Sequence, residues 1–504
     1  MSSDDLIAWF KSRNGTVDTS SMGFAEYPAC GRGAVALKDI PQGHVLFTIP
    51  RDVTLSTRTS SLPSLFGMEA WKRLGLDKGW AGLILCMMWE EAQGSVSRWS
   101  AYLSSLPSAF DTPMFWPDDD IKELAGTAVV DKIGKEEAER DYAEKLIPAI
   151  QGRPELFPEG ARQLHYSLER YHIMGSRILS RSFHVEPWSG DEEHDEAAED
   201  SDPEGQAMDV DQQEDTQGET AIGDTERPPD DTLEVDSADS DDEGAEDSAV
   251  VAMVPMADML NARYESENAK LFHEAKDLRM VTTKPIKAGE QIWNTYGDLP
   301  NSDLLRRYGH VDLVPVPQPL GGLGNPADVV EIRGDLAVAA VTDGQSTSLG
   351  ERVDWWLENA DDDTFVIGTD CELPEDLVSF VRLLLMPLDE WGKTSGKAKL
   401  PKPKVDLGVL TVIEKTLARR MQDYPNSLVE DEQLLESAND GLSLNRKHAI
   451  IVRIGEQRIL RGTLHKVRAT KESMKPASSN TKDKKRPREA TDSNPHGKGK
   501  KSRR

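Results

Sequence analysis

Alternation of apolar and polar residues predicts short β-strands at two distant places in the chain. Val45, Phe47 and Ile49 alternate as in a half-buried strand, after a turn at residues 41–43 that contains proline and glycine. A second strand is predicted at residues 278–282, and a similar proline- and glycine-containing turn follows it. The two patterns indicate a mixed fold with small sheets built from distant segments.

Apolar residues three and four positions apart predict helices elsewhere. Helices are expected over residues 4–11, 83–91, 135–150 and 162–182. After about residue 328 the pattern becomes mostly helical. One apolar face there consists of Leu407, Leu410, Ile413, Leu417 and Met421. Such faces predict a second, all-helical domain.

The charge of the chain is concentrated in two segments. The 504 residues, enough for two or three domains, carry a formal net charge of -30. Between residues 191 and 247 there are 26 acidic residues and one base, Arg227. Such a segment cannot bury enough apolar surface to fold, so we expect a disordered surface loop inserted into a folded core. From residue 471 onward, 12 bases and 4 acids predict a disordered basic tail.

Cysteine usage and hydropathy exclude several classes of protein. The three cysteines are far apart, without zinc-ligand spacing, and an odd number does not make a disulfide framework. A reducing intracellular compartment fits this usage. No apolar run reaches the ~18 residues of a membrane span, and residues 1–11 lack the features of a secretory signal.

Two short stretches place polar and aromatic residues within apolar runs. Residues 254–262 carry Asp258 and Asn261 three positions apart, and residues 289–297 contain a predicted strand that ends near Tyr296. Buried polar groups must be bonded, and strands that end in such residues often line pockets. The structural alternative is that Asp258 and Asn261 bond neighbouring backbone amides and that Tyr296 is a core aromatic residue.

Glycine and arginine positions give two further signals. Gly31 and Gly33 allow close backbone approach, but the third glycine and the following helix of a dinucleotide-binding motif are missing. Arg181 ends the predicted helix at 162–182, where it is either a solvated helix-end cation or an anion-binding group.

Taken in order, these stretches resemble SET-domain protein lysine methyltransferases of the Rubisco large-subunit methyltransferase-like branch. Within that branch the chain looks most like fungal ribosomal-protein lysine methyltransferases. The resemblance spans residues 4–188 and 250–468. Its motifs are Gly-Arg-Gly-Ala-Val-Ala at 31–36, Trp-x-x-Tyr-Leu-x-x-Leu-Pro at 99–107, Pro-Met-Ala-Asp-Met-Leu-Asn at 255–261, Gly-Glu-x-x-x-Asn-x-Tyr-Gly at 289–297 and Leu-x-x-x-Tyr-Gly at 304–309.

The resemblance implies an α+β fold. A SET domain of small curled β-sheets is expected at 22–297, with a pseudoknot in which the Asp258 stretch is threaded beside the Tyr296 stretch. A helical insertion is expected at about 66–249 and contains the disordered acidic loop, 189–248. The expected order then continues with a post-SET helix and connection (298–324), a helical substrate-binding domain like the C-terminal domain of Rubisco methyltransferase (325–470) and a disordered basic tail (471–504).

The resemblance also implies the chemistry, which is methyl transfer from S-adenosylmethionine to a lysine ε-amine without a metal ion. Tyr296 matches the catalytic tyrosine, which also contacts the substrate. The positions that match cofactor-binding residues are Cys30, Gly31, Arg32, Arg181, Asn261, Ala262 and Tyr308. The other positions that match residues near the target lysine are Trp116, Ser182, His184 and Asp258.

One position departs from the family pattern. Many members carry Asn-His where this chain has Asn261-Ala262. Because backbone contacts survive the loss of an imidazole, we expect cofactor binding to persist.

The expected substrate is a lysine of a large-subunit (60S) ribosomal protein, and the expected state is a monomer without membrane or specific nucleic-acid partners. The basic tail is either a solvated charge run or a nuclear import signal. The expected location is the nucleus, with the cytoplasm as a second compartment. Two alternatives are a methyltransferase acting on histones or another nuclear protein, and a non-catalytic SET-like module whose acidic loop binds basic proteins. The complete set of Asn261, Tyr296 and Tyr308 favours the enzyme.

Overall fold

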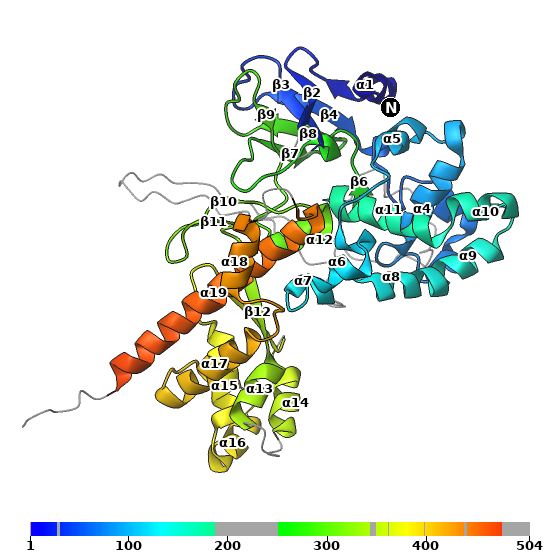
Figure 1. Ribbon diagram of the computed structural model, residues 1–504. Helices are drawn as coiled ribbons and strands as arrows, with labels where there is room; N and C mark the ends of the chain where they lie inside the picture. The colour runs from blue at the N-terminus through cyan, green and yellow to red at the C-terminus, as the bar shows by residue number, and fades with distance from the viewer. Residues whose placement is uncertain are drawn as a thin grey trace, which may run out of the picture.

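The computed structural model describes residues 2–27, 31–186, 250–342, 349–360, 362–397, 399–437 and 441–475. Cys30, the whole predicted acidic loop (189–248) and residues 476–504 of the predicted tail lie outside these ranges. Figure 1 shows small sheets at one end of the molecule, a group of helices beside them, and a second group of helices at the other end. The long helix α19 begins near the centre of the molecule and extends outward to the lower left, where the described chain ends.

Three small antiparallel sheets form the β part of the SET region, with strand orders β1-β4-β8-β7, β2-β3-β9 and β5-β6. The strands predicted near residues 45–49 and 278–282 are confirmed as β4 and β8, and they pair with Ile49 opposite Leu278. The strand bounds are β1 Thr16–Val17, β2 Met22–Tyr27, β3 Gly31–Ala36, β4 Val45–Pro50, β5 Ser182–Val185, β6 Val250–Met253, β7 Ala269–His273, β8 Asp277–Thr282 and β9 Gln291–Ile292.

The two candidate stretches of the sequence lie side by side. Ala262 and Asn294 form a parallel bridge, and the Asn294 amide donates to the Asn261 carbonyl over 2.9 Å. The adjacency that the resemblance implied is therefore present. Threading of one stretch through the other stays a prediction.

Helices fill the chain between β4 and β5, and most of them share one hydrophobic core with the sheets. Helices α6 and α7 instead pack in a separate cluster with α12 and α19. The helices predicted at 4–11 and 83–91 are confirmed as α1 and α4. The single helix predicted at 162–182 is wrong, because the chain breaks after α10 and Ser167 caps α11 by accepting from the Arg170 amide. Helix bounds in this half are α1 Ser3–Ser12, α2 Leu62–Phe66, α3 Met68–Arg73, α4 Ala81–Ala92, α5 Ser100–Ser105, α6 Asp118–Lys122, α7 Ala128–Asp131, α8 Lys135–Asp141, a π-helical turn Tyr142–Leu146, α9 Ile147–Gly152, α10 Glu159–His165 and α11 Leu168–Arg181.

The C-terminal region is helical with one exception. An antiparallel pair, β12 and β13, lies within it, so the all-helical prediction is wrong in this detail. Its separate hydrophobic core joins this pair to the surrounding helices. The bounds of the remaining elements are α12 Asn301–Tyr308, β10 Val314–Pro315, β11 Leu323–Gly324, β12 Val329–Arg333, α13 Gly334–Thr342, α14 Gly350–Asn359, β13 Thr364–Gly368, α15 Glu375–Leu385, α16 Leu388–Ser395, α17 Leu407–Arg420, α18 Leu428–Ser437 and α19 Leu444–Met474.

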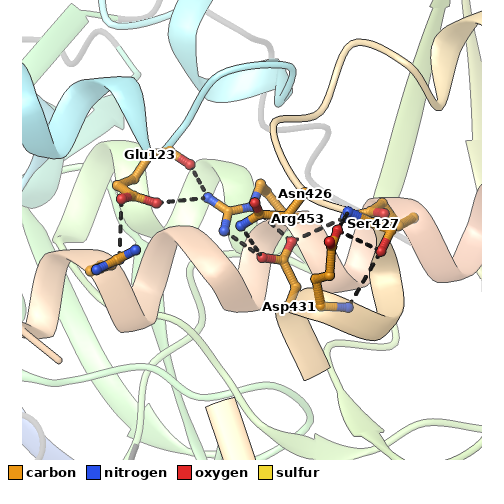
Figure 2. Close-up of polar contacts among 8 residues, drawn as sticks. Glu123, Asn426, Ser427, Asp431 and Arg453 are labelled. Atoms are coloured by element: carbon orange, nitrogen blue, oxygen red, sulfur yellow. Dashed lines mark hydrogen bonds and ion pairs between the residues drawn. The ribbon is translucent and has the colours of Figure 1, made fainter. Parts of the chain in front are cut away.

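Helix α19 joins the two halves of the molecule. It extends to Met474, so residues 471–474 are helical and the predicted tail begins later than expected. Arg453 of α19, which is fully buried, forms two hydrogen bonds with Asp431 of α18 and donates to the backbone carbonyl of Glu123, just after α6 (Figure 2). Buried charges persist only when they are paired and hydrogen-bonded, so this network fixes the helical domain against the insertion.

Candidate active site

Strand β3 approaches the Asn261 stretch closely. A Cβ atom added at Gly33 would lie 2.5 Å from the side-chain amide nitrogens of both Asn261 and Gln291. Asn261 Nδ2 donates to the Arg32 carbonyl oxygen over 3.4 Å. Gly31, with a φ of +67°, adopts a conformation that favours glycine. The predicted cradle of Gly31, Arg32 and Asn261 is therefore assembled from residues 229 positions apart.

The Asp258 stretch begins with a strained residue. Met256 is fully buried and has a φ of +78°, which is unusual for a side chain other than glycine. Such strain costs about 1–3 kcal/mol and persists where the surrounding structure fixes it. A short 3₁₀ turn, Ala257–Met259, then carries Asp258 into the interior.

Tyr296 and Tyr308 lie face to face. Their ring centroids are 4.0 Å apart and their planes differ by 2°. Tyr308 ends α12, and Gly309 caps that helix in the left-handed conformation. Burial, with a smaller contribution from Tyr296, raises the pKa of the Tyr308 phenol. Tyr308 therefore stays protonated at neutral pH.

A cavity of about 480 Å³ opens beside this aromatic pair, and Ala262, Tyr296 and Leu304 contribute to its wall. The wall is rich in charge, with more acidic than basic residues. The charged residues are Arg263, Glu265, Glu267, Lys284, Asp298 and Asp312. A cavity of this character suits a ligand that brings positive charge.

Arg181 and Asp258 meet on another side of the Asn261 stretch. Arg181 Nη1 donates to the Asp258 carbonyl oxygen, and Tyr102 donates its hydroxyl to Asp258 Oδ2 over 2.8 Å. Burial raises the pKa of Asp258 to about 6, although Arg181 and Arg32 both lower it. The sequence interpretation gave Asp258 a place near the target lysine and gave Tyr102 no role. The motif at 99–107 was the signal that pointed to Tyr102.

The remaining predicted residues contribute less directly. Trp116 is buried in a small apolar cluster and donates its indole N–H to the Asp111 carbonyl oxygen over 2.9 Å. Ser182 begins β5 opposite Met253, and His184 is exposed on the same strand. Trp116 therefore has the environment of a packing residue.

Two observations test whether these residues fit a bound cofactor with an amino-acid part. Gly33 leaves no room for a side chain where β3 meets Asn261, which brings backbone groups within reach of a ligand. Arg181 Nε and Asp258 Oδ1 are both buried and have no hydrogen-bond partner in the described part of the chain. A buried donor and a buried acceptor without partners are costly, and a ligand carrying a carboxylate and an amine would satisfy them. The residues fit S-adenosylmethionine.

Within the described ranges, no three His, Cys, Asp or Glu side chains gather as metal ligands. The same ranges contain no helix that is long and apolar enough to cross a bilayer.

Comparison with known proteins agrees with this geometry. The SET-domain family matches residues 31–297, and the family described as Rubisco LSMT substrate-binding matches residues 346–460. The human N-lysine methyltransferase SETD6 is 27% identical over 456 residues, covering 85% of this chain and 83% of that protein. Ribosomal lysine N-methyltransferase 4 of Saccharomyces cerevisiae is 26% identical over 450 residues, covering 83% and 80%.

Solved structures share the fold. The SET domain of LSMT bound to lysine and AdoHcy superposes with a TM-score of 0.63 at 16% identity, covering 94% of this chain and 92% of that one. Rubisco LSMT bound to AdoMet gives a TM-score of 0.61 with the same coverage.

The SET match covers more than half of the chain, which therefore belongs to the SET-domain family. The fold class predicted from the sequence is confirmed. The protein is a SET-domain protein-lysine N-methyltransferase with S-adenosylmethionine as its cofactor.

Proposed function

We propose that this protein methylates a lysine of a large-subunit ribosomal protein, and that Tyr296 is its catalytic residue. The observation that carries the proposal is the cavity at Tyr296, whose wall contains Ala262 and more acidic than basic residues. Ribosomal proteins are rich in lysine and arginine, so their segments complement this wall. The yeast relative named ribosomal lysine N-methyltransferase 4 supports the same substrate class.

S-adenosylmethionine, when bound, supplies a methyl group on a positively charged sulfur that leaves as a neutral thioether. We assign its binding to the backbone of Gly31 and Arg32, the stretch Asn261–Ala262, and Tyr308. Arg181 suits the carboxylate of its amino-acid part, because a guanidinium can donate two parallel hydrogen bonds. Cys30 belongs to the same proposal, although it lies outside the described residues.

The substrate lysine must lose a proton before its nitrogen can attack the methyl carbon, because its free pKa is about 10.4. Water can accept this proton before the lysine enters. The Tyr296 hydroxyl then orients the amine, and the stack against Tyr308 fixes the Tyr296 ring. Ser182, His184 and Trp116 remain proposed substrate-side positions, with Trp116 acting through packing. Asp258 was expected on the same side, but its carboxylate Oδ1, which has no hydrogen-bond partner within the described ranges, supports a place beside the cofactor.

The test is transfer of labelled methyl groups to large-subunit ribosomal proteins. These are expressed in bacteria, so that this enzyme has not already methylated them. Core histones serve as matched basic substrates, and mass spectrometry identifies the modified lysine. Label on one ribosomal protein that disappears with Tyr296→Phe is the expected result. Label on histones alone would move the proposal to a nuclear substrate, and binding of basic proteins without any label would favour a non-catalytic module.

The location is a separate proposal, in which residues 476–504 direct the protein to the nucleus. Its support is the two basic clusters in that segment, at 482–488 and 498–504. Imaging of the fluorescently tagged chain with and without residues 476–504 tests it, and unchanged nuclear signal after the deletion would refute it.

A further inference from the structure

The motif at residues 99–107 has no role in the function proposed above. It nevertheless contacts Arg32 directly, and it contacts Asp258, the hydrogen-bond partner of Arg181. Tyr102 donates its hydroxyl to Asp258 Oδ2 over 2.8 Å. Three residues later, the Ser105 carbonyl oxygen accepts from Arg32 Nη2 over 3.0 Å. One short helix, α5, therefore holds the Asp258 carboxylate and the Arg32 guanidinium at once.

This segment is itself anchored on both sides of α5. Trp99 donates its indole N–H to the Val53 carbonyl oxygen over 2.8 Å. The Pro107 carbonyl oxygen accepts from Arg177 Nε over 2.9 Å. Tyr102 is fully buried. These contacts leave the Tyr102 hydroxyl little freedom, so it is a fixed donor.

Asp258 links the fixed Tyr102 hydroxyl to Arg181. Arg181 Nη1 donates to the Asp258 carbonyl oxygen, so the guanidinium is attached to the backbone of the residue whose carboxylate Tyr102 holds. Arg181 Nε and Asp258 Oδ1 have no hydrogen-bond partner among the described residues, and both atoms are buried. Tyr102 thus satisfies one carboxylate oxygen and leaves the other, together with Arg181 Nε, available for a ligand.

We propose that Tyr102 is a positioning residue that fixes Asp258 and, through it, presents Arg181 to the amino-acid part of S-adenosylmethionine. This proposal rests on the proposed function, because it assumes that the cofactor carboxylate meets Arg181. It assigns the motif at 99–107 the role of fixing the residues around the cofactor. It also moves Asp258 from contact with the target lysine to support of the cofactor.

The test compares two ligands by isothermal titration calorimetry, so it does not depend on turnover or on the protein substrate. S-adenosylhomocysteine carries the amino-acid part, and 5′-methylthioadenosine lacks it. Because Tyr102→Phe removes a hydrogen bond to a buried charged group, it is expected to raise the Kd of S-adenosylhomocysteine about 10-fold, which corresponds to about 1.4 kcal/mol. The Kd of 5′-methylthioadenosine is expected to change less than about 2-fold, because that ligand never meets Arg181.

Tyr142→Phe is the matched control. The Tyr142 hydroxyl donates to the Tyr166 carbonyl oxygen over 2.8 Å, so this variant also loses one hydrogen bond within the helical insertion. It should leave both affinities unchanged. Equal weakening of both ligands by Tyr102→Phe, or no weakening of either, would overturn the proposal. Failure of the unaltered protein to bind S-adenosylhomocysteine would instead refute the cofactor assignment on which the proposal rests.

The pH dependence provides a second readout that a purely structural role would not shift. The groups that face Asp258 are the Tyr102 hydroxyl and the guanidinium groups of Arg181 and Arg32. Loss of the hydroxyl donor raises the pKa of Asp258 above its value of about 6. The affinity for S-adenosylhomocysteine should therefore begin to fall at a higher pH in Tyr102→Phe than in the unaltered protein as the pH is lowered. Identical pH profiles would contradict the role assigned to Tyr102.

Discussion

Replacement of Arg453 by methionine should destabilise the helical domain strongly. Arg453 and Asp431 are both fully buried, and the guanidinium donates from Nε and Nη2 to the two carboxylate oxygens over 2.8 and 2.6 Å (Figure 2). Nη1 reaches Glu123 of the insertion as well. Methionine keeps the apolar stem but leaves the Asp431 carboxylate buried without its cation.

The expected loss of unfolding free energy is about 3–5 kcal/mol, the range for a buried pair that loses one partner. Total stabilities of natural proteins are about 5–15 kcal/mol, so the loss should be visible as a shifted or early transition in urea followed by circular dichroism. The double variant Arg453→Met, Asp431→Leu should recover most of the loss, because it removes the uncompensated charge together with its partner.

Arg458→Met on the same helix is the control. Arg458 pairs with Glu432 over 3.0 Å, but the two side chains are 30% and 36% exposed. An exposed pair contributes about 0–1 kcal/mol, so this variant should shift the transition little. If Arg453→Met destabilises the protein no more than Arg458→Met does, the interpretation of the buried network is wrong.

Three further predictions concern the site and its surroundings. Tyr296→Phe should lower the rate of methyl transfer about 100-fold or more, while the Kd of S-adenosylhomocysteine in calorimetry stays within about 3-fold. Gly33→Ala should weaken S-adenosylhomocysteine, because its Cβ would lie 2.5 Å from two side-chain amides, whereas Gly23→Ala, with its nearest contact at 3.4 Å, should bind normally. Burial raises the pKa of Asp328 to about 7, so its stabilising contribution is present at low pH and is lost as the pH rises through about 7. Between pH 5.5 and 8.5 this loss amounts to about 2 kcal/mol, and Asp328→Asn should remove it. Urea midpoints that change equally between these two pH values in both proteins would contradict this.

Local periodicity predicted the longer amphipathic helices and the two paired strands, since a buried face imposes its own spacing on the sequence. It gave no individual signal for short helices such as α2, α6 and α7. It did not predict the break between α10 and α11, where α10 has no buried residue and its Leu164 is 69% exposed. Ser167 was the available signal, as a serine before a helical run is a frequent N-cap. The β12–β13 pair was missed because its two strands are separated by helices and recognise each other only after folding.

The site was predicted as far as its residues lie in recognisable motifs. Asn261 and the Tyr296 stretch meet as expected through the bond from Asn294 to Asn261. Tyr102 was missed because its partner, Asp258, is 156 residues away in the sequence. No pattern within either stretch indicates that pairing, and only the burial of both side chains in the folded protein makes it energetically important.

Helix α12 makes the stack of Tyr308 on Tyr296, and with it the proposed catalytic geometry, depend on the helical domain. Its first amide, of Asn301, donates to Asp328 Oδ1 over 2.8 Å, and its last residue, Tyr308, stacks on Tyr296. Between these ends, Leu305 packs in a cluster with Ala449 and Val452 of α19. Helix α12 is therefore held at its N-terminus, along its apolar face and at the Tyr308 ring. It can position the Tyr308 ring accurately only while α19 remains packed against it. The buried network at Arg453 lies far from Tyr296 in the sequence, but it holds α19, which packs against the same helix that carries Tyr308, the ring stacked on Tyr296.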